Sequence, residues 1–311
     1  MKLVTYRRRA DDTPRVGALD AALTHVVDLA SHFRDMLALI DGGDTALERA
    51  RELVDLATVA CPLAELTLLA PLPEPRQLRD AMTFELHYQQ SIDAFAALRV
   101  GRPLARVAKA LGIARIPKVW YQQPTYYKCN RFSVVGPEAD VIWPKGETRM
   151  DFECEIAIVI GKTGKDIPRE RAREHVFGYT IFNDMTARDL QGRELSGNLG
   201  PAKGKDFDTG NVLGPWIVTR DELTDPYDLT MISRVDGEEW GRGQSASMHH
   251  RWEDVIAHVS RDETLHAGEV IGSGTVGNGC GLEQGRFLRA GSVIELEVSR
   301  LGTLRNRLVK R

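Results

Sequence analysis

The sequence predicts an α+β protein that is mostly β, with a small α/β domain at its N-terminus. From residue 118 onward, short β-rich runs are separated by Gly, Pro and Asp, which is typical of strands joined by turns. Helical spacing is confined to a few segments that do not alternate regularly with the strands. Residues 71–75 contain three prolines and form a stiff, extended connector. We therefore expect two domains, spanning residues 1–72 and 73–311.

The N-terminal domain is expected to begin with a strand at residues 2–6, followed by a turn at 17–20. Apolar residues recur at helical spacing over residues 29–40, so this segment is predicted to be an amphipathic helix. A glycine pair at 42–43 should end that helix, and a second helix should run from 46 to about 56.

In the second domain, residues 83–111 are predicted to be helical, with a break at Gly101-Arg102-Pro103. Two further helical patches are expected at 168–176 and 252–260. The predicted strands include residues 132–135, 157–160, 178–182, 216–218, 229–235 and 293–298. The pattern favours mostly antiparallel sheets over a regular βαβ fold.

Composition excludes several classes of function. The 311 residues are 42% hydrophobic and 27% charged, and the net charge of −3 comes from mixed signs without a basic stripe, so a nucleic-acid partner is not expected. No apolar run reaches the roughly 20 residues of a membrane span, and the N-terminus lacks the apolar region of a signal peptide. The four cysteines show no C-x-x-C pairing, which argues against a zinc knuckle or a disulfide framework. We expect a cytoplasmic protein without a membrane partner.

Two glutamates in a predicted strand suggest a cation site. Side chains alternate along a strand, so Glu153 and Glu155 share one face. An exposed polar face is one interpretation, but the following residues are apolar on both faces, which indicates a buried strand. Burying unpaired carboxylates costs several kcal/mol or more, so a cation should meet them.

Asp184 follows another apolar run and could join this site or cap a helix, and this segment alone leaves both readings open. All-oxygen ligation favours Mg²⁺ or Mn²⁺, with Ca²⁺ also compatible, over zinc. The glycine-rich loop around Lys205 suits stabilisation of an anion, which is a weak signal alone. A second glycine-rich segment, residues 268–283, lacks the features of a nucleotide site. His87 could be a general base or a structural histidine, and His249-His250 is interpreted as structural.

Together these motifs resemble the fumarylacetoacetate hydrolase family over nearly everything after residue 75. The resemblance is carried by Asp-Phe-Glu-Cys-Glu-Ile-Ala at 151–157, Phe-Asn-Asp-Met-Thr-Ala-Arg-Asp-Leu-Gln at 182–191 and Gly-Lys-Asp-Phe-Asp-Thr at 204–209. Ser-Gly-Thr at 273–275 and the spacing of Asp80 and His87 complete the set. The family's mixed β-sandwich or roll is the fold that this resemblance implies for the second domain.

The resemblance also implies a role for each matched position. The cation carboxylates would be Asp80, Glu153, Glu155 and Asp184, with Lys205 and Thr209 beside the cation. His87 would be the catalytic base, oriented by Glu283, and Lys205 would assist catalysis. Contacts to substrate oxygens would come from Tyr127, Gln191 and Thr275.

Several positions depart from the family's pattern. Met82 and Leu195 stand where fumarylacetoacetate hydrolase has tyrosines, which argues against fumarylacetoacetate itself as the substrate. Shorter members place a glutamate where this chain has Gln90, so the pairing of His87 with Glu283 is favoured. The pocket walls are expected from residues 100–119, an insertion, and from 192–200.

The resulting hypothesis is a metal-dependent hydrolase that cleaves a C–C bond in a 1,3-dicarbonyl acid, such as an acylpyruvate, through a metal-bound enolate. His87 would activate the attacking water. Dehydration, decarboxylation or tautomerisation of a 2-oxo acid on the same site is the alternative, and a non-catalytic ligand-binding protein is a third. The expected partner is a small oxo acid, and the resemblance suggests a homodimer.

Overall fold

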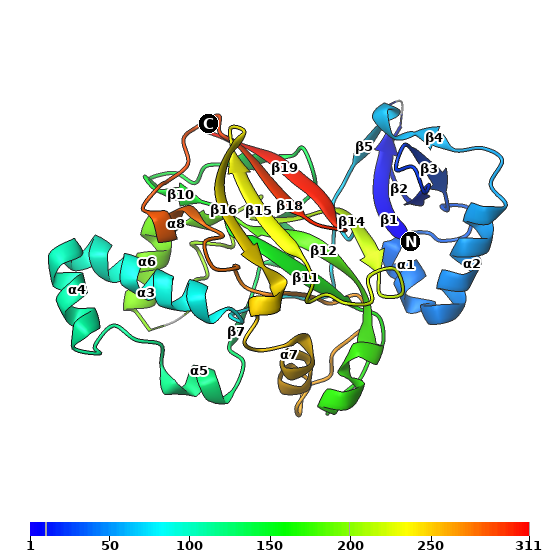
Figure 1. The fold of residues 1–311 in the computed structure, drawn as a ribbon. Helices are drawn as coiled ribbons and strands as arrows, with labels where there is room; N and C mark the ends of the chain where they lie inside the picture. Colours follow the sequence, from blue (N-terminus) through cyan, green and yellow to red (C-terminus); the bar gives the residue numbers. More distant parts are fainter. Residues whose placement is uncertain (10, 199, 311) are drawn as a thin grey trace.

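Two β-sheets packed against each other form the centre of the molecule (Figure 1). The structure is a computed structural model and describes residues 1–9, 11–198 and 200–310. Most strand pairs are antiparallel, as predicted, and the exceptions are β6 with β17, β8 with β14 and β9 with β19. The predicted α+β class with a large β component is confirmed.

The large sheet has twelve strands, in the order β4-β3-β2-β1-β14-β12-β11-β17-β6-β7, with β5 paired to β1 and β8 to β14. Its strands are β1 (Lys2–Arg8), β2 (Asp11–Leu19), β3 (His25–Asp28), β4 (Cys61–Pro62), β5 (Leu66–Leu68), β6 (Leu78–Ala81), β7 (Tyr126–Lys128), β8 (Val134–Val135), β11 (Cys154–Ile160), β12 (Val176–Asp184), β14 (Asn211–Thr219) and β17 (Val270–Gly272). Every residue of β11 and β12 is buried, which confirms the predicted two-sided burial of the strand that carries Glu155.

The second sheet has five strands, in the order β16-β15-β18-β19-β9. They are β9 (Asp140–Ile142), β15 (Thr230–Val235), β16 (Glu238–Gln244), β18 (Val293–Val298) and β19 (Gly302–Val309). Side chains that point inward from both sheets, such as Ile156 and Leu296, share one apolar core. Residues at alternate positions of β18 are buried, as expected for a sheet with one face on a core.

The N-terminal strands extend the large sheet, because β1 pairs with β14 at Lys2–Val218 and Leu3–Ile217. Two helices, α1 (Met36–Asp41) and α2 (Gly43–Asp55), pack on this sheet (Figure 1). The division of the chain after residue 72 stays a prediction.

The predicted helix at 29–40 is wrong in its first half. Leu29 is buried but lies in a turn, where its carbonyl accepts the N–H groups of His32 and Phe33. Asp35 then accepts the N–H of Ala38 through its side chain, which starts α1 one residue later. The predicted turn at 17–20 is also wrong, because residues 17–19 belong to β2.

Helices α3 (Glu85–Val100), α4 (Arg102–Ala110), α6 (Arg188–Ser196) and α8 (Gly281–Gln284) gather at one end of the sheets, on the left in Figure 1. The predicted helical region 83–111 is confirmed as α3 (Glu85–Val100) and α4 (Arg102–Ala110), which are separated by Gly101 at φ +82°. The remaining helices are α5 (Lys118–Gln122), α6 (Arg188–Ser196), α7 (Trp252–Val259) and α8 (Gly281–Gln284). Short 3-10 turns are η1 (Leu63–Glu65), η2 (Arg131–Ser133), η3 (Arg169–His175) and η4 (Ser245–Ser247). In the described part of the chain, no helix has the length and apolar character needed to cross a bilayer.

A separate two-stranded ladder joins β10 (Met150–Asp151) to β13 (Thr186–Ala187). This ladder holds the segment before β11 against the segment after β12. Leu288, beyond α8, bonds to the other side of Met150 through its N–H at 2.9 Å. Residues 150–154 are therefore held between two parts of the chain that are distant in sequence.

Candidate metal centre and cavity

Four acidic side chains meet near the end of β6, the start of β11 and the end of β12. One carboxylate oxygen from each of Asp80, Glu153, Glu155 and Asp184 lies within 4.8 Å of the others. All four residues are buried, with exposed fractions of at most 5%. The structure therefore brings together the four acids that the sequence pattern and the resemblance proposed as metal carboxylates.

The register of the strands explains this meeting. β11 and β12 are antiparallel with Cys154 opposite Asn183, so the start of β11 lies beside the end of β12. Asp184 is the last residue of β12, and the next α-helix begins only at Arg188, so Asp184 is not a helix cap. On the other side, β6 runs parallel to β17 and places Asp80 opposite Gly272.

Gly272 leaves the space that the acids occupy. A Cβ atom at this position would lie 2.6 Å from Oδ1 of Asp80 and 2.9 Å from Oε2 of Glu155. Such distances are shorter than real Cβ contacts, so any larger residue would displace the carboxylates. Two residues later, the N–H of Gly274 donates to the same two oxygens at 3.1 and 3.0 Å.

Lys205 is the main cation of the cluster. Its Nζ donates to Oε2 of Glu153 at 2.8 Å and also contacts Oδ2 of Asp184. The hydroxyl of Tyr127 donates to that same Asp184 oxygen at 2.6 Å. Oδ1 of Asp184 has no hydrogen-bond partner within the described residues, although it is buried.

Burial and charge move the pKa values of these groups in different directions. Burial raises the pKa of Glu155 well above its usual range, and the neighbouring Asp80 and Asp184 carboxylates raise it further. Burial also raises the pKa of Asp184 to about 7, although the Lys205 ammonium opposes the shift. For Glu153, burial is outweighed by Lys205 and Arg188, and its pKa lies below its usual range. The cluster thus has more negative charge than its own cations neutralise.

The residues fit a hard divalent cation. The donor set consists of carboxylate oxygens, which Mg²⁺ and Mn²⁺ prefer, and one of them is a buried acceptor without a partner. In the described part of the chain, the buried cations in contact with these acids are Lys205 and Arg188. Arg188 is also bound to a fifth buried carboxylate, that of Asp151. These buried acids could therefore hold a metal ion.

A histidine–glutamate pair lies close to the acidic cluster. Nδ1 of His87, on α3, lies 2.9 Å from Oε1 of Glu283 on α8, and both side chains are buried. The other ring nitrogen, Nε2, lies 3.3 Å from Oγ of Ser91, one turn further along α3. His87 lines the cavity described below, so its Nε2 is the nitrogen available for proton transfer once Nδ1–H is held by the carboxylate.

One cavity of about 910 Å³ reaches His87 of the pair and two acids of the cluster, Asp80 and Glu153. Its wall includes Asp80, Glu153, Lys205, His87 and Thr275. Apolar side chains of α3 and α6 form its outer part, namely Ile92, Phe95, Leu98 and Leu195. The expectation that residues 192–200 form part of the wall is confirmed for Gly192, Arg193, Leu195, Ser196 and Gly200, whereas residue 199 lies outside the described residues. The expectation that residues 100–119 form a wall is wrong. Those residues do not line the cavity because the chain turns at Gly101 into α4, and α3 itself forms the wall.

Other predicted site residues have different surroundings. Tyr127, Gln191 and Thr275 line the cavity, and Gln191 accepts from Nη1 of Arg188 at 2.9 Å. The hydroxyl of Thr209 instead accepts the N–H of Ile142 on β9 at 2.8 Å, and Thr209 does not line the cavity.

The pair His249-His250 has surroundings that suit a structural role. Both rings pack on Trp120, and Nε2 of His250 contacts the carbonyl of Trp120 at 2.5 Å.

Sequence reasoning did not select two residues of the site, Asp151 and Arg188. Asp151 continues the alternation of Glu153 and Glu155, so it belongs to the same acidic face and could have been found by that signal. Arg188 lies four residues after Asp184, and its partners come from a separate part of the chain. Its Nη1 contacts Oε1 of Glu153 and its Nη2 contacts Oδ2 of Asp151, each at 2.7 Å.

Comparisons with known proteins agree with this geometry. Residues 96–309 match the family model described as Fumarylacetoacetate (FAA) hydrolase C-terminal. The chain is 31% identical to the mitochondrial oxaloacetate tautomerase Fahd2a of Rattus norvegicus, over 99% of this chain and 92% of that protein. It is 30% identical to the oxaloacetate tautomerase YisK of Bacillus subtilis, over 96% of this chain and 94% of that protein.

The fold comparison gives the same answer. The fumarylacetoacetate hydrolase of the psychrophile Exiguobacterium antarcticum superposes with a TM-score of 0.77 at 29% identity, and the match covers 100% of both chains. The family model covers more than half of the chain, and the relatives align along nearly its whole length. The chain therefore belongs to the fumarylacetoacetate hydrolase family.

Proposed function

We propose that this protein is a cation-dependent enzyme acting on small oxo acids, with His87 as the group that moves the proton. The observation that carries the proposal is that His87, which Glu283 holds, lines the same cavity as Asp80 and Glu153, two of the four clustered carboxylates. Mg²⁺ or Mn²⁺ would be held by Asp80, Glu153, Glu155 and Asp184. When bound, such a cation supplies Lewis-acid polarisation of substrate oxygens and compensates developing negative charge.

The reaction that we favour is hydrolysis of a C–C bond in a 1,3-dicarbonyl acid of the acylpyruvate type. Glu283 holds Nδ1–H of His87, so Nε2 can accept a proton from water as the water oxygen bonds to the distal carbonyl carbon. The C–C bond then breaks, its electron pair goes to the pyruvate-like fragment, and the proton on His87 can be returned to that carbon. The products are a carboxylic acid and a 2-oxo acid, so one water is consumed.

A second candidate is keto–enol tautomerisation of an oxaloacetate-like acid. It is favoured by the names of the two relatives that align along nearly the whole chain. Here the same Nε2 would take a proton from the carbon between the carbonyl and the carboxylate. The proton is returned elsewhere on the molecule, and no water is consumed. Both candidates need the His87–Glu283 pair, and they differ in whether water attacks.

One experiment tests the proposal and separates the candidates. The protein is incubated with Mg²⁺ or Mn²⁺ and either acetylpyruvate or the enol form of oxaloacetate, and enol absorbance and product masses are followed. Hydrolysis yields two fragments, whereas tautomerisation changes absorbance without a change in mass. His87→Ala and a chelator-treated sample serve as controls. Absence of cation-dependent turnover with either acid, and with a wider panel of acylpyruvates and 2-oxo-3-deoxy sugar acids, would contradict the enzymatic proposal.

The homodimer and the cytoplasmic location stay predictions.

A further inference from the structure

Asp151 lies between the two halves of the candidate site and is completely buried. Its Oδ1 accepts the N–H groups of Gly281 at 2.8 Å and of Phe152 at 2.9 Å. Its Oδ2 accepts the N–H of Leu282 and Nε of Arg188, each at 2.8 Å. One carboxylate therefore ties together the strand β10, the start of α8 and the start of α6.

The contacts on α8 lead to the histidine. Gly281 and Leu282 are the first two residues of this helix, and the third is Glu283, which holds Nδ1 of His87. The other oxygen of Glu283 accepts the N–H of Cys280 at 3.1 Å. A Cβ atom on Gly281 would lie 2.7 Å from Oδ1 of Asp151, so the helix approaches this carboxylate as closely as only glycine allows.

The contact on Arg188 leads to the metal carboxylates. The planar guanidinium contacts Oδ2 of Asp151 on one side and Oε1 of Glu153 on the other, each at 2.7 Å. A guanidinium fork holds its two partners in a fixed relative orientation, because its donors are rigidly placed. The path from Glu153 to His87 thus runs through Arg188, Asp151 and the first turn of α8, and each of its polar contacts is 2.9 Å or shorter.

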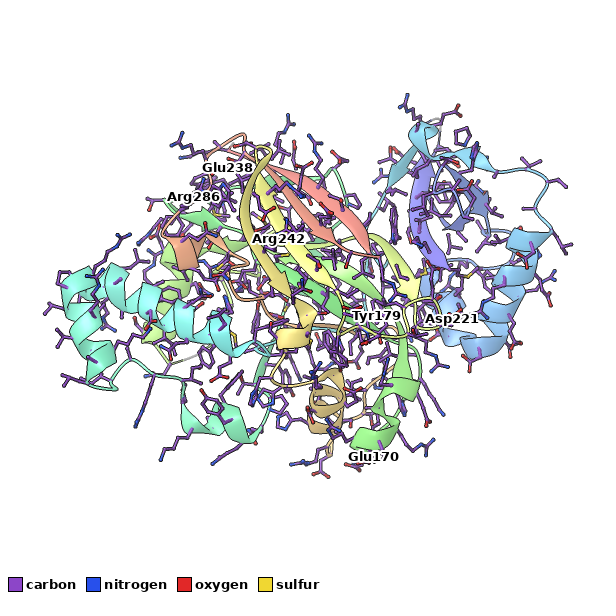
Figure 2. All side chains as sticks on the ribbon, viewed as in Figure 1. Glu170, Tyr179, Asp221, Glu238, Arg242 and Arg286 are labelled. Carbon is purple, nitrogen blue, oxygen red and sulfur yellow. The ribbon has the colours of Figure 1, made fainter. Side chains whose placement is uncertain are left out.

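We propose that Asp151 is a positioning residue that fixes the His87–Glu283 pair relative to the metal carboxylates. This inference rests on the proposed function, in which a proton moves between His87 and a molecule held at those carboxylates. α8 has only four residues, so it has few hydrogen bonds of its own to fix its place. On the outer side, its loop is held by the ion pair of Arg286 and Glu238, which Figure 2 shows at the surface. Exposed ion pairs contribute little to stability, so the buried Asp151 is the firmer anchor.

The alternative is that Asp151 only satisfies buried N–H groups and has no part in catalysis. The two readings differ in what Asp151→Asn should do. The amide keeps the size of the side chain but cannot accept from all the donors that now meet the carboxylate. A structural residue would then lower the thermal stability and leave the turnover of the folded protein intact. A positioning residue would lower kcat in the folded protein, with little change in Mn²⁺ affinity, because Glu153 keeps its contact with Lys205.

The test is a double-mutant cycle on the full-length, cation-loaded protein. Asp151→Asn, Glu283→Gln and the double variant are compared for kcat, KM and Mn²⁺ affinity. We expect Asp151→Asn to lower kcat by about tenfold to a hundredfold, the range seen when a catalytic group is misplaced by about 1 Å. Because Asp151 acts through Glu283, the double variant should be no slower than Glu283→Gln alone. The proposal would be overturned if the loss of kcat in the double variant equalled the product of the losses in the two single variants. A wild-type kcat in Asp151→Asn would also overturn it.

A matched control is Asp35→Asn. Asp35 also accepts a backbone N–H at the start of a short helix, α1, in the N-terminal part of the chain. This variant should leave kcat unchanged. If Asp151→Asn does not fold, Gly281→Ala replaces it, since the added methyl group would meet the carbonyl oxygen of Arg286 at 2.2 Å and Oδ1 of Asp151 at 2.7 Å, and so displace the start of α8 without altering a titratable group. It is expected to lower kcat in the same range, and wild-type kcat in this variant would count against the proposal.

A readout without turnover separates this inference from the proposed function. The side-chain NMR signals of His87, assigned by comparison with His87→Asn, report the hydrogen bond to Glu283 directly. Asp151→Asn should move them in the direction that Glu283→Gln moves them, and Asp35→Asn should not. Unmoved signals would refute the positioning role even in an active enzyme. If the signals move but no oxo acid is turned over, the proposed function fails and the structural link stands.

Discussion

Nδ1 of His87 lies 2.9 Å from Oε1 of Glu283, although 196 residues separate them in the chain. Both side chains are almost fully buried, so the contact is shielded from bulk solvent. A carboxylate on one ring nitrogen fixes the tautomer that leaves the other nitrogen free to accept a proton.

Replacing His87 by Ala should lower turnover by about a hundredfold or more, because general bases contribute roughly 10²–10⁴ to the rate. Cation binding should persist, since His87 is not one of the four clustered acids. Steady-state kinetics and a Mn²⁺ titration of the same sample check both parts. Wild-type turnover in this variant would remove His87 from the mechanism.

Replacing Gly272 by Ala should weaken cation binding. The new methyl group would lie 2.6 Å from Oδ1 of Asp80, so either the strand or the acid has to move. Overpacking of this kind costs about 1–3 kcal/mol of folding free energy. Gly192→Ala is the matched control, because its Cβ would meet Phe95 at an ordinary 3.7 Å. Calorimetric titration measures the Mn²⁺ affinity of both variants. The same Mn²⁺ affinity in Gly272→Ala and Gly192→Ala would disprove the crowding argument.

Replacing Lys205 by Met should destabilise the cation-free protein. Breaking a buried ion pair by removing one partner costs about 3–5 kcal/mol, because the other charge stays buried and unpaired. Lys205 is paired with both Glu153 and Asp184, so among the described residues its loss leaves Asp184 without a cationic partner and Glu153 with Arg188 alone. Added Mg²⁺ or Mn²⁺ should restore part of the stability. Thermal unfolding with and without cation measures both effects, and an unchanged Tm in the absence of cation would contradict them.

The stabilisation produced by the cation should increase with pH. Burial raises the pKa of Asp184 to about 7 in the folded protein, well above its unfolded value of about 3.9. Without a cation, the folded state therefore binds more protons than the unfolded state in this interval. The stability contribution of Asp184 is full below its unfolded pKa and is lost as the pH rises through about 7.

A bound cation replaces the proton on the Asp184 carboxyl group of the folded protein. The Tm increase produced by saturating Mg²⁺ should therefore be larger at pH 8 than at pH 6. The pKa of Glu155 is also raised, and it acts in the same direction. Asp184→Asn should flatten the pH dependence of the cation-free protein. Equal cation-induced shifts at pH 6 and pH 8 would show that the acids are already ionised without a cation, and a larger shift at pH 6 would contradict the replacement of a proton by the cation.

Features with a local cause could be predicted from the sequence. Strand alternation placed Glu153 and Glu155 on one face, and apolar residues on both faces of the strand predicted its burial. The break at Gly101 follows from the backbone freedom of glycine before an Arg-Pro pair, and the structure confirms it.

Features that depend on distant partners could not be predicted in this way. Asp151 belongs to the predicted acidic face, but its role depends on Gly281 and Leu282, about 130 residues later. Leu29 is apolar at helical spacing with its neighbours, yet it is buried from a turn. Periodicity reports which side chains are buried, and it does not distinguish a helix from a turn that packs on the same core.

The pairing of β1 with β14 also bears on how the chain can be shortened. Lys2 and Leu3 cover the backbone of residues 217 and 218, which would otherwise be the open border of the large sheet. Removal of residues 1–72 would leave this border with unpaired N–H and C=O groups, and such borders recruit other chains into intermolecular sheets. We therefore expect the first strands to limit self-association, and we expect a fragment produced without them to precipitate even though it retains Asp80, Glu153, Glu155 and Asp184.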